Sequence, residues 1–478
     1  MEGLFVGGTI VTMDENRRVL QGHAIAVCGE KIKEIGPEKE LREKYNHFQI
    51  IDCTNHCVLP GLIDCHGHSG HSLLKGLSVD TIHNWGDSVY QIQFLYSDEE
   101  FWAADGRLAA MDRLKNGVTT SVSVIGCEPR ADKPDYAREV ALGYEKLGAR
   151  AVIGVGPGSA KWPKKVGQYQ EGKRKEVYAS WEDYMNSTEA LLQEFGKEDH
   201  ERIRIFVTPF TVLPDKPTWG RTAPERCHCL TAFEKMQMRE VKRLAAKYDT
   251  GIHSDAFGNL IHLMAMAEEA LLGPNVLLQH CHDLSMDEIR ILAQTKTNVG
   301  HSPESTVRYC PYAEMLAEHV NVAITSDGTA PRNGYDLFQI MRKIQMLEHY
   351  RFDDINYLPV GTLLEGITVN AARALGMEKE IGSLEAGKDA DIVTVSMDKP
   401  HLVPWEDMPV HRLVLDANGH DVDQVWVKGR QCVDKRKLLL ADEDQIVREA
   451  DRIAKRCVGE AGLEGEWNVP VWRSAYRY

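Results

Sequence analysis

Two kinds of hydrophobic pattern divide the chain. From Leu4 to about Pro60, short apolar segments rich in β-branched residues are separated by glycines, which is typical of short strands. A similar texture returns late in the chain, in KDADIVTVSMD and VDQVWVKGRQCVDK. We therefore predict that both chain ends pair into one small β-sandwich domain, with residues 1–59 and 385–440 as its two parts.

The middle of the chain, residues 60–384, has a different pattern. Apolar strand-like segments alternate there with helical stretches such as TAFEKMQMREVKRLAAKY, as expected of βα units around a parallel sheet. Eight strands are expected, and in chain order they read GLIDCHGH, GVTTSVSVIG, RAVIGVGPGSA, RIRIFVTPF, TGIHSDAF, NVLLQHCHD, TNVGHSP and VAITSDGT. They predict an α/β fold with a closed (β/α)₈ TIM-like barrel. A doubly wound open sheet is the alternative, but no G-x-G-x-x-G turn follows the first strand.

The last segment, residues 441–478, contains the amphipathic stretch DEDQIVREADRIAKRC. We expect a C-terminal helical extension that packs on the surface of the protein or on a neighbouring subunit.

Composition narrows the possible partners. The chain has 478 residues and a formal net charge of -15, which argues against a phosphate-binding surface, so we expect a small-molecule substrate and no nucleic acid. The 11 cysteines are scattered, and the pair Cys227 and Cys229 around His228 is interpreted as a loop, because no second cluster completes a zinc site. The N-terminus lacks a secretory signal, and no apolar stretch approaches the ~20 residues that cross a bilayer, so we expect a cytoplasmic protein with no membrane contact.

Histidines mark the ends of several predicted strands. His66 and His68 are two residues apart in DCHGH, so both side chains point to the same side at the carboxyl end of strand one, where barrels place active sites. A single histidine at a strand end is more often a hydrogen-bonded core residue. Here, however, histidines end strands one, five, six and seven and an aspartate ends strand eight, which predicts a metal site that includes His253 and Asp327.

These segments resemble the amidohydrolase superfamily, in the branch of cytosine-type deaminases and triazine or phenylurea hydrolases. The resemblance covers nearly the whole chain. It is carried by VLPGLIDCHGHSGHSLLKG, GIHSDAFG, LLQHCHDL, GHSPES, ITSDGTAPRNGYDLFQIMRK and ITVNAARALGMEKEIGSLEAGKDADIVTV.

The resemblance implies a role for each strand-end residue. His66, His68, His253 and Asp327 would bind one divalent ion, expected to be zinc, with Fe²⁺, Co²⁺ and Mn²⁺ as alternatives. Asp327 would also transfer a proton, and His280 would lie beside the bound water. The resemblance also implies a homo-oligomer. Three further residues are assigned around the substrate: His301 as a contact, His282 as an alternative to His280, and His71 as either a contact or a packing residue at the rim.

Two departures from the family pattern matter. Two-metal members use a carboxylated lysine from strand four, whereas RIRIFVTPFTV has no lysine before Lys216, so one ion is the simpler interpretation. Deaminase members carry a glutamate three residues after the strand-five histidine, and here that position is Ala256. Asp255 could point inward only if the strand continues that far, and its side chain is shorter.

Ala256 stands where deaminase members carry a glutamate, which argues against a deaminase. We therefore expect a hydrolase that cleaves a C–N bond of an amide, urea or carbamate, similar to phenylurea and thiocarbamate hydrolases of xenobiotic degradation. The alternative is a deaminase or dechlorinase of a purine, pyrimidine or triazine ring. A third possibility is a non-enzymatic relative, which the intact ligand set opposes. Trp85, Trp162 and Tyr169 could form an aromatic wall for the substrate.

Overall fold

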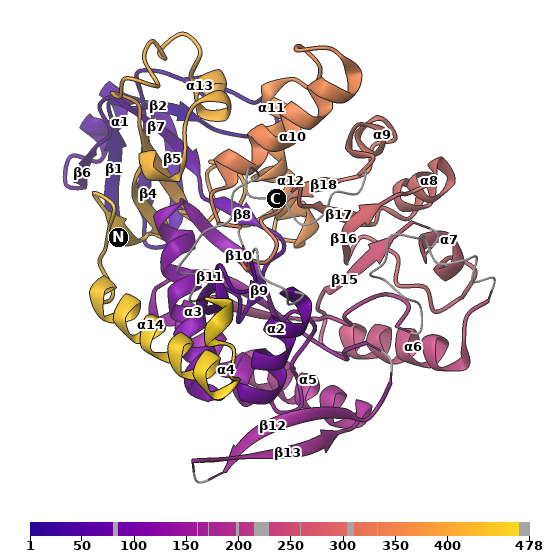
Figure 1. Ribbon diagram of the computed structural model, residues 1–478. Coiled ribbons are helices and arrows are strands. Elements are labelled where there is room, and N and C mark those ends of the chain that lie inside the picture. The colour runs from indigo at the N-terminus through magenta and orange to yellow at the C-terminus, as the bar shows by residue number, and fades with distance from the viewer. Residues whose placement is uncertain are drawn as a thin grey trace, which may run out of the picture.

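A computed structural model describes residues 1–79, 85–159, 161–170, 172–196, 200–214, 229–258, 260–303, 310–331 and 333–467 (Figure 1). Its centre is a barrel whose parallel strands follow one another in chain order. They are β8 (Leu62–Asp64), β10 (Val118–Ile125), β11 (Arg150–Val155), β14 (Ile203–Val207), β15 (Ile252–Phe257), β16 (Val276–His282), β17 (Asn298–His301) and β18 (Val322–Ile324). A short strand, β9 (His68–Ser69), pairs with the end of β10. The predicted TIM-like barrel is confirmed.

The barrel is filled with apolar side chains at its amino-terminal end. One buried cluster takes one residue from each of several strands, including Ile63, Val122, Val152, Phe206, Leu277 and Ala323. Helix α12 (Val369–Ala374) closes this end, because Ala371 and Leu375 belong to the same cluster. Since this end is packed solid, polar chemistry is confined to the carboxyl ends of the strands.

Helices surround the barrel and begin at well-defined caps. Capping boxes start α5 at Ser180, α6 at Thr231 and α8 at Ser285, and each satisfies otherwise unpaired backbone N–H groups. The helices of the barrel part are α2 (Trp85–Gln91), α3 (Glu99–Lys115), α4 (Asp135–Lys146), α5 (Trp181–Phe195), α6 (Ala232–Lys247), α7 (Leu260–Met264), α8 (Met286–Thr295), α9 (Tyr312–Ala317), α10 (Leu337–Phe352) and α11 (Val360–Gly366).

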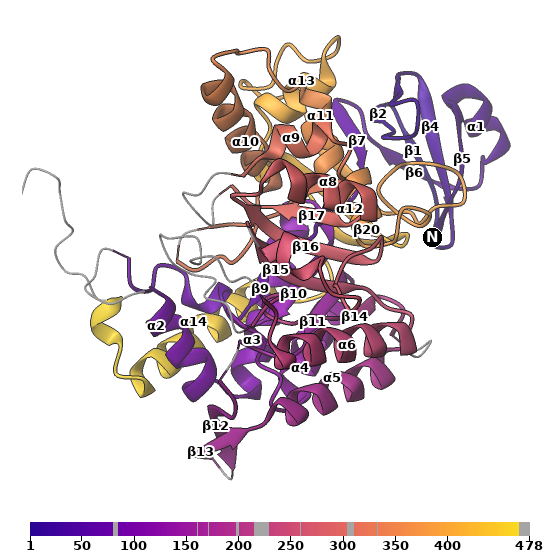
Figure 2. The same ribbon diagram turned by 90° about the vertical axis from the view of Figure 1, so that its right-hand side faces the viewer.

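The two chain ends form a β-sandwich beside the barrel, as the turned view in Figure 2 shows. One sheet has the order β5 (Lys31–Pro37), β4 (His23–Cys28), β1 (Glu2–Val6) and β6 (Gln49–Asp52), with α1 (Glu38–Lys44) packed against it. The other has the order β22 (Lys437–Leu438), β21 (Arg430–Asp434), β20 (Val422–Val427), β19 (Ile392–Ser396), β7 (His56–Pro60), β2 (Thr9–Val11) and β3 (Val19–Leu20). Antiparallel pairing of β7 with β19 confirms that both chain ends build this domain. The residue boundaries of the domains stay predictions.

Three further elements lie outside the barrel helices and the two sandwich sheets. Helix α14 (Glu443–Glu460) packs along α3, and Arg456 forms ion pairs with Asp98 at 2.6 Å and with Glu100 at 3.4 Å. A hairpin of β12 (Lys164–Gln170) and β13 (Lys173–Ala179) projects from the body (Figures 1 and 2). Helix α13 (Pro409–Leu415) packs against α11. Within the described ranges, no helix is long and apolar enough to cross a membrane.

Candidate metal centre

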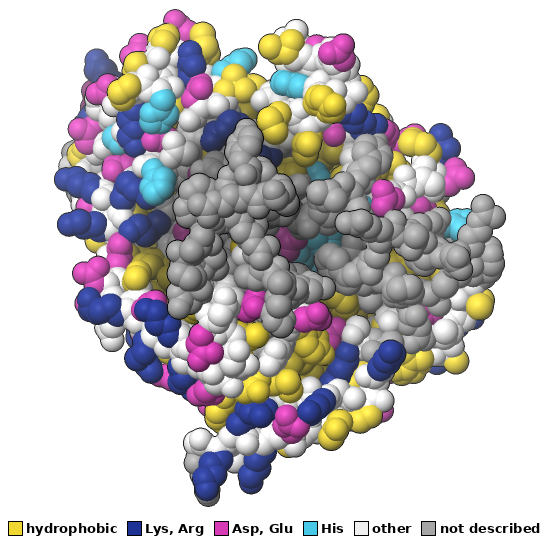
Figure 3. All heavy atoms as spheres, in the orientation of Figure 1, with side chains coloured by type: hydrophobic (Ala, Val, Ile, Leu, Met, Phe, Trp, Pro, Cys, Tyr) yellow, Lys and Arg dark blue, Asp and Glu magenta, His cyan; other side chains and the backbone are white. Residues whose placement is uncertain are grey.

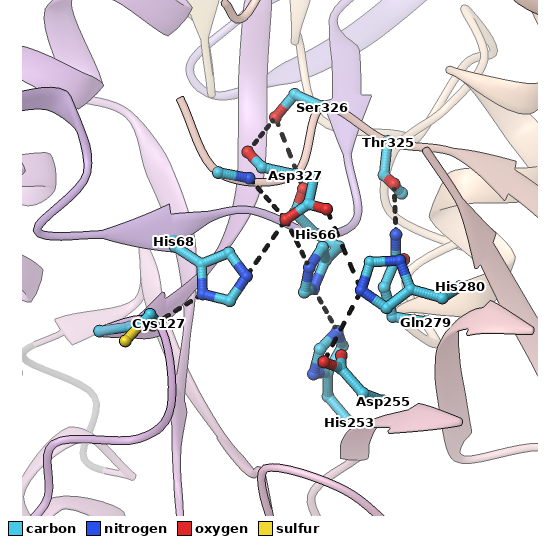
Figure 4. A network of polar contacts seen from close by, with 12 residues as sticks. His66, His68, Cys127, His253, Asp255, Gln279, His280, Thr325, Ser326 and Asp327 are labelled. Atoms are coloured by element: carbon cyan, nitrogen blue, oxygen red, sulfur yellow. Dashed lines mark hydrogen bonds and ion pairs between the residues drawn. The ribbon is translucent and has the colours of Figure 1, made fainter. Parts of the chain in front are cut away.

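Histidine and carboxylate side chains line a hollow in the middle of one face of the protein (Figure 3). Two histidines from strand one and the aspartate after β18 meet there. Asp327 Oδ1 lies 3.3 Å from His66 Nε2 and 3.2 Å from His68 Nε2, and all three side chains are buried (Figure 4). His66 lies between β8 and β9 and His68 begins β9, and both point toward Asp327, with which they form a group that could hold a metal ion.

The spacing of these donor atoms suits a zinc-type ion. Ligand bonds of about 2.0–2.1 Å in a tetrahedral site place neighbouring ligand atoms roughly 3.3 Å apart. The Asp327–His66 and Asp327–His68 separations are close to this value. His66 Nε2 is buried and makes no hydrogen bond within the described part of the chain. The three residues therefore fit a divalent metal.

His253 lies beside this group. Its Nε2 is 3.0 Å from His66 Nδ1, and the two rings stack with their centroids 4.9 Å apart. His253 Nδ1 is also buried without a hydrogen bond among the described residues. The structure thus gathers His66, His68 and Asp327 into one group and places His253 against the other nitrogen of His66.

Burial and charge set the protonation of these side chains. Burial lowers the pKa of His66 and holds the pKa of His253 well below its usual range, so both imidazoles favour the neutral form that binds metals. Burial also opposes the charged forms of His68 and Asp327, but their mutual attraction outweighs it. The pKa of His68 is raised, and the pKa of Asp327 is lowered well below its usual range. The group therefore favours a positive charge next to the Asp327 carboxylate.

A second pair of polar side chains faces the same hollow. β15 continues to Phe257, so Asp255 and His253 project to the same side of the strand. Asp255 Oδ2 lies 3.7 Å from His280 Nε2, and His280 Nε2 lies 4.0 Å from Asp327 Oδ2. His66, Asp255 and His280 form a second group with metal-ligating atoms. Burial raises the pKa of Asp255 to about 8 and lowers the pKa of His280 to about 3.

The backbone is bent out of regular strand geometry at this end of the barrel. His280, Cys281 and Asp327 have φ values of 72°, 49° and 63°, in a left-handed region that non-glycine residues seldom adopt. Asp327 Oδ1 accepts a hydrogen bond from Gly328 N at 2.6 Å, which holds the carboxylate in this conformation. Such conformations persist where the surrounding structure fixes them, and they cluster at functional sites.

The remaining predicted histidines surround the group. His282 stacks on His280 with centroids 5.5 Å apart, and His301 lies next to His282 at 6.4 Å. His280 Nε2 is the atom that faces Asp255 at 3.7 Å and Asp327 at 4.0 Å. His71 stacks on His68 at 4.9 Å and is buried, so it lies within the site. Burial lowers the pKa of His301 to about 3.

Two of the three residues expected in an aromatic wall, Trp162 and Tyr169, have partners elsewhere in the protein. The hydroxyl of Tyr169 donates to Glu460 on α14, and Trp162 packs edge-on against Tyr184 with centroids 4.9 Å apart. Tyr169 thus joins the hairpin to α14, and Trp162 packs against the buried Tyr184 of α5. The side chain of Trp85, and Lys216, Cys227 and His228, lie outside the described residues. β14 contains no lysine.

The barrel and its histidine and aspartate group are those expected of a metal-dependent hydrolase, and the family match and deaminase relatives place the protein among hydrolases that act on carbon–nitrogen bonds other than peptide bonds. Residues 57–432 match the Amidohydrolase family, and the chain belongs to this family. A 5′-deoxyadenosine deaminase of Methanosarcina acetivorans is 30% identical over 473 residues, which are 95% of this chain and 97% of the relative. A 5-methylthioadenosine/S-adenosylhomocysteine deaminase of Syntrophus aciditrophicus is 27% identical over 466 residues, 95% and 97% of the two chains.

Solved structures share the fold. A zinc-bound adenosine deaminase from Xanthomonas campestris superimposes with a TM-score of 0.79 at 23% identity, covering 96% of this chain and 99% of its own. An atrazine chlorohydrolase from Arthrobacter aurescens TC1, complexed with zinc, superimposes with a TM-score of 0.77 at 20% identity, covering 95% and 100%. At these identities the likeness shows the fold alone.

These relatives correct the functional prediction. The expected cleavage of an amide, urea or carbamate is wrong, because relatives that match this chain over nearly its whole length are deaminases of adenine-containing compounds. A phenylurea or thiocarbamate hydrolase character is not supported. The prediction was wrong because it took Ala256 to mean that the site lacks a carboxyl group on this strand. The carboxyl group of Asp255, one residue earlier in the chain, projects into the site. The length of β15 is what decides this point, because a strand that extends to Phe257 places Asp255 on the same side as His253.

Proposed function

We propose that this protein is a zinc-dependent deaminase that removes the exocyclic amino group of an adenine ring in a 5′-deoxyadenosine-like compound. The similarity to 5′-deoxyadenosine and methylthioadenosine deaminases along the whole chain supports the substrate class. The observation that carries the proposal within the site is the buried carboxyl of Asp255, which faces His280 at 3.7 Å. This carboxyl supplies the proton-transfer group that the sequence lacks at position 256.

His66, His68, His253 and Asp327 would hold the ion. A bound divalent ion supplies a water molecule whose pKa falls from about 15.7 toward about 7, and so provides a nucleophile at neutral pH. Asp327 and His280 lie on the same side of the site, with Asp327 Oδ2 4.0 Å from His280 Nε2. Asp327 accepts the proton of the attacking water, and His280 orients that water and donates a hydrogen bond to the oxygen.

Asp255 acts on the ring. Its carboxyl donates a proton to the ring nitrogen next to the carbon under attack, which lets that carbon accept the electron pair of the new C–O bond. When the C–N bond breaks, the amino group leaves as ammonia with the proton that Asp327 carries. The ring nitrogen keeps its proton in the oxo product and the hydroxyl proton returns to Asp255, so one water is consumed and one ammonia released.

The test is ammonia release by the purified, zinc-loaded protein from 5′-deoxyadenosine, methylthioadenosine and adenosine, followed by the ultraviolet change from an adenine to a hypoxanthine ring. Phenylureas, anilides and a chlorotriazine serve as comparison substrates. We expect stoichiometric ammonia from at least one adenine compound. Amine release from the ureas, chloride release from the triazine, or no turnover of the adenine compounds would each contradict the proposal.

A pair of histidine variants connects the activity to the metal. His66→Ala should lose both bound zinc and ammonia release, because it removes a buried donor of the ion. His47→Ala, at an exposed position of the sandwich domain, is the matched control and should keep both. Metal content measured by elemental analysis and ammonia release on the same samples give the comparison. Full ammonia release by a His66→Ala protein that contains no zinc would exclude a role for the ion, and wild-type zinc content in this variant would exclude His66 as a ligand.

A further inference from the structure

The barrel has a seam between its last and first strands. Among the described residues, neighbouring strands from β8 to β18 pair in sequence, but β18 and β8 share no strand pairing. One backbone hydrogen bond crosses the seam above them, from Asp327 N to His66 O at 3.0 Å. Two of the proposed metal ligands therefore lie on opposite sides of a join that regular sheet hydrogen bonding does not hold.

The side chain of Asp64 bridges this seam. It is fully buried at the end of β8, two residues before His66. Asp64 Oδ1 accepts a hydrogen bond from Ser326 N at 2.9 Å, and Asp64 Oδ2 accepts one from Ser326 Oγ at 2.6 Å. Ser326 directly precedes Asp327, as Figure 4 shows. One carboxylate thus ties the segment that carries His66 to the segment that carries Asp327.

A buried arginine holds that carboxylate. Arg113 on α3 donates to Asp64 Oδ2 from Nε at 3.3 Å and from Nη2 at 3.2 Å, and its Nη1 donates to the Tyr144 hydroxyl. Its guanidinium carbon lies 4.0 Å from the centre of the Tyr335 ring, within cation–π range. Because Arg113 is only 1% exposed, the ion pair is desolvated, and removing either partner would leave a buried charge without its counter-ion.

The arginine also contacts the ligand segment directly. A Cβ atom at Gly67, between the two strand-one histidines, would lie 2.2 Å from Arg113 Nη2 and 3.3 Å from the backbone oxygen of Asp327. Gly67 is therefore pressed between the guanidinium group and the aspartate segment. The backbone between His66 and His68 thus contacts Arg113 on one side and the backbone of Asp327 on the other.

We propose that Arg113 and Asp64 are positioning residues that fix the separation of His66 and His68 from Asp327 across the seam, and thereby set the affinity for the metal. This rests on the metal site of the proposed function. The competing explanation is a buried ion pair that contributes only to folding. Residues that orient metal ligands typically change metal affinity about 10–100-fold when they are replaced.

A second buried arginine in the same barrel offers a matched control. Arg150, at the start of β11, is 3% exposed and donates to Asp389 at 2.7 Å and also to Asp391. It joins the barrel to the segment before β19, at the opposite end of the strands from the metal group. Arg113→Lys and Arg150→Lys make the same chemical change in two desolvated ion pairs, and only the first touches the ligand segments.

The measurement is the zinc dissociation constant of each full-length variant, obtained by competition with a chromogenic chelator, together with its urea unfolding midpoint. We expect Arg113→Lys to bind zinc about 10–100-fold more weakly than the wild type. Arg150→Lys should lose stability but keep the wild-type dissociation constant. Equal weakening in both variants, or an unchanged dissociation constant in Arg113→Lys, would overturn the inference.

A milder variant keeps the test decisive if Arg113→Lys does not fold. Ser326→Ala removes a hydroxyl that donates to Asp64 Oδ2 at 2.6 Å and also contacts Asp327 O at 3.2 Å and His66 O at 3.5 Å, so it loosens the seam and leaves the Arg113–Asp64 ion pair in place. It should also weaken zinc binding without unfolding the protein. A folded Ser326→Ala with wild-type affinity would count against the seam as the determinant. If the wild-type protein itself binds no zinc, the proposed function fails, whereas zinc binding that is indifferent to these variants refutes only the role of the seam.

Discussion

Replacing Asp255 by asparagine is the most direct test of how the ring would be protonated. The asparagine side chain has the same shape and keeps one oxygen toward His280, which lies 3.7 Å away, but it cannot give up a proton. A positioned acid or base contributes about 10²–10⁴ to a rate, which at ~1.4 kcal/mol per decade is about 3–5.5 kcal/mol of the activation barrier. We therefore expect kcat/KM for the adenine substrate to fall by about 10²–10⁴.

The assay is steady-state ammonia release by Asp255→Asn, with the zinc content of the same sample. Ser254→Ala is the matched control, because Ser254 is buried in the same strand but donates to Pro209 O at 2.9 Å, away from the site. The control should keep its activity. If Asp255→Asn retained activity within about tenfold of the wild type, the acid role would be refuted. If the variant instead lost its zinc, Asp255 would be a ligand and not a proton donor.

Two further predictions follow from the site and its support. Removal of zinc with a chelator should abolish ammonia release and lower the thermal midpoint, and one equivalent of zinc per subunit should restore both; unchanged turnover in a metal-free sample would refute the role of the ion. Asp105 is buried on α3 and accepts hydrogen bonds from Ser72 N at 2.8 Å and Leu73 N at 3.2 Å, and burial raises its pKa to about 6. Because the folded protein then binds this proton more tightly than the unfolded chain, its contribution to stability is greatest below about pH 4 and falls by about 3 kcal/mol as the pH rises through about 6. Urea unfolding should show this fall in the wild type and not in Asp105→Asn, and parallel pH profiles would contradict it.

The sequence predicts the barrel because apolar segments of strand length alternate with helical segments along residues 60–384, and these apolar segments form the buried strands. Each predicted strand is present, and the apolar texture of residues 1–59 and 385–440 matches two segments that pair at β7 and β19. The meeting of His66, His68 and Asp327 also follows from the fold, since the carboxyl ends of barrel strands share a rim. These features depend on neighbours in the chain or on the regular geometry of the fold.

The predicted substrate class was wrong because the position of Asp255 depends on contacts between segments far apart in the chain. Whether Asp255 enters the site depends on where β15 ends and on the irregular register between Ala256 and Phe257, which the partner strand sets. The contacts of Arg113 with Asp64 and Gly67 join a helix to a strand end about 50 residues away in the chain, and nothing in the sequence around Arg113 marks it. Tyr169 was misplaced for the same reason, because its partner Glu460 belongs to the C-terminal helix.

The pairing of β7 with β19 has a consequence for how the protein is made. β7 ends at Pro60 and β19 begins at Ile392, so the ribosome adds about 330 residues between them. At about 5–20 residues per second, this takes roughly 15–70 s. Throughout that time one edge of the buried, apolar strand β7 has no partner, and unpaired strand edges promote aggregation of nascent chains. The yield of folded protein should therefore depend on translation speed and on chaperones. This dependence should be stronger than in a barrel protein in which each domain is formed by one continuous segment of the chain.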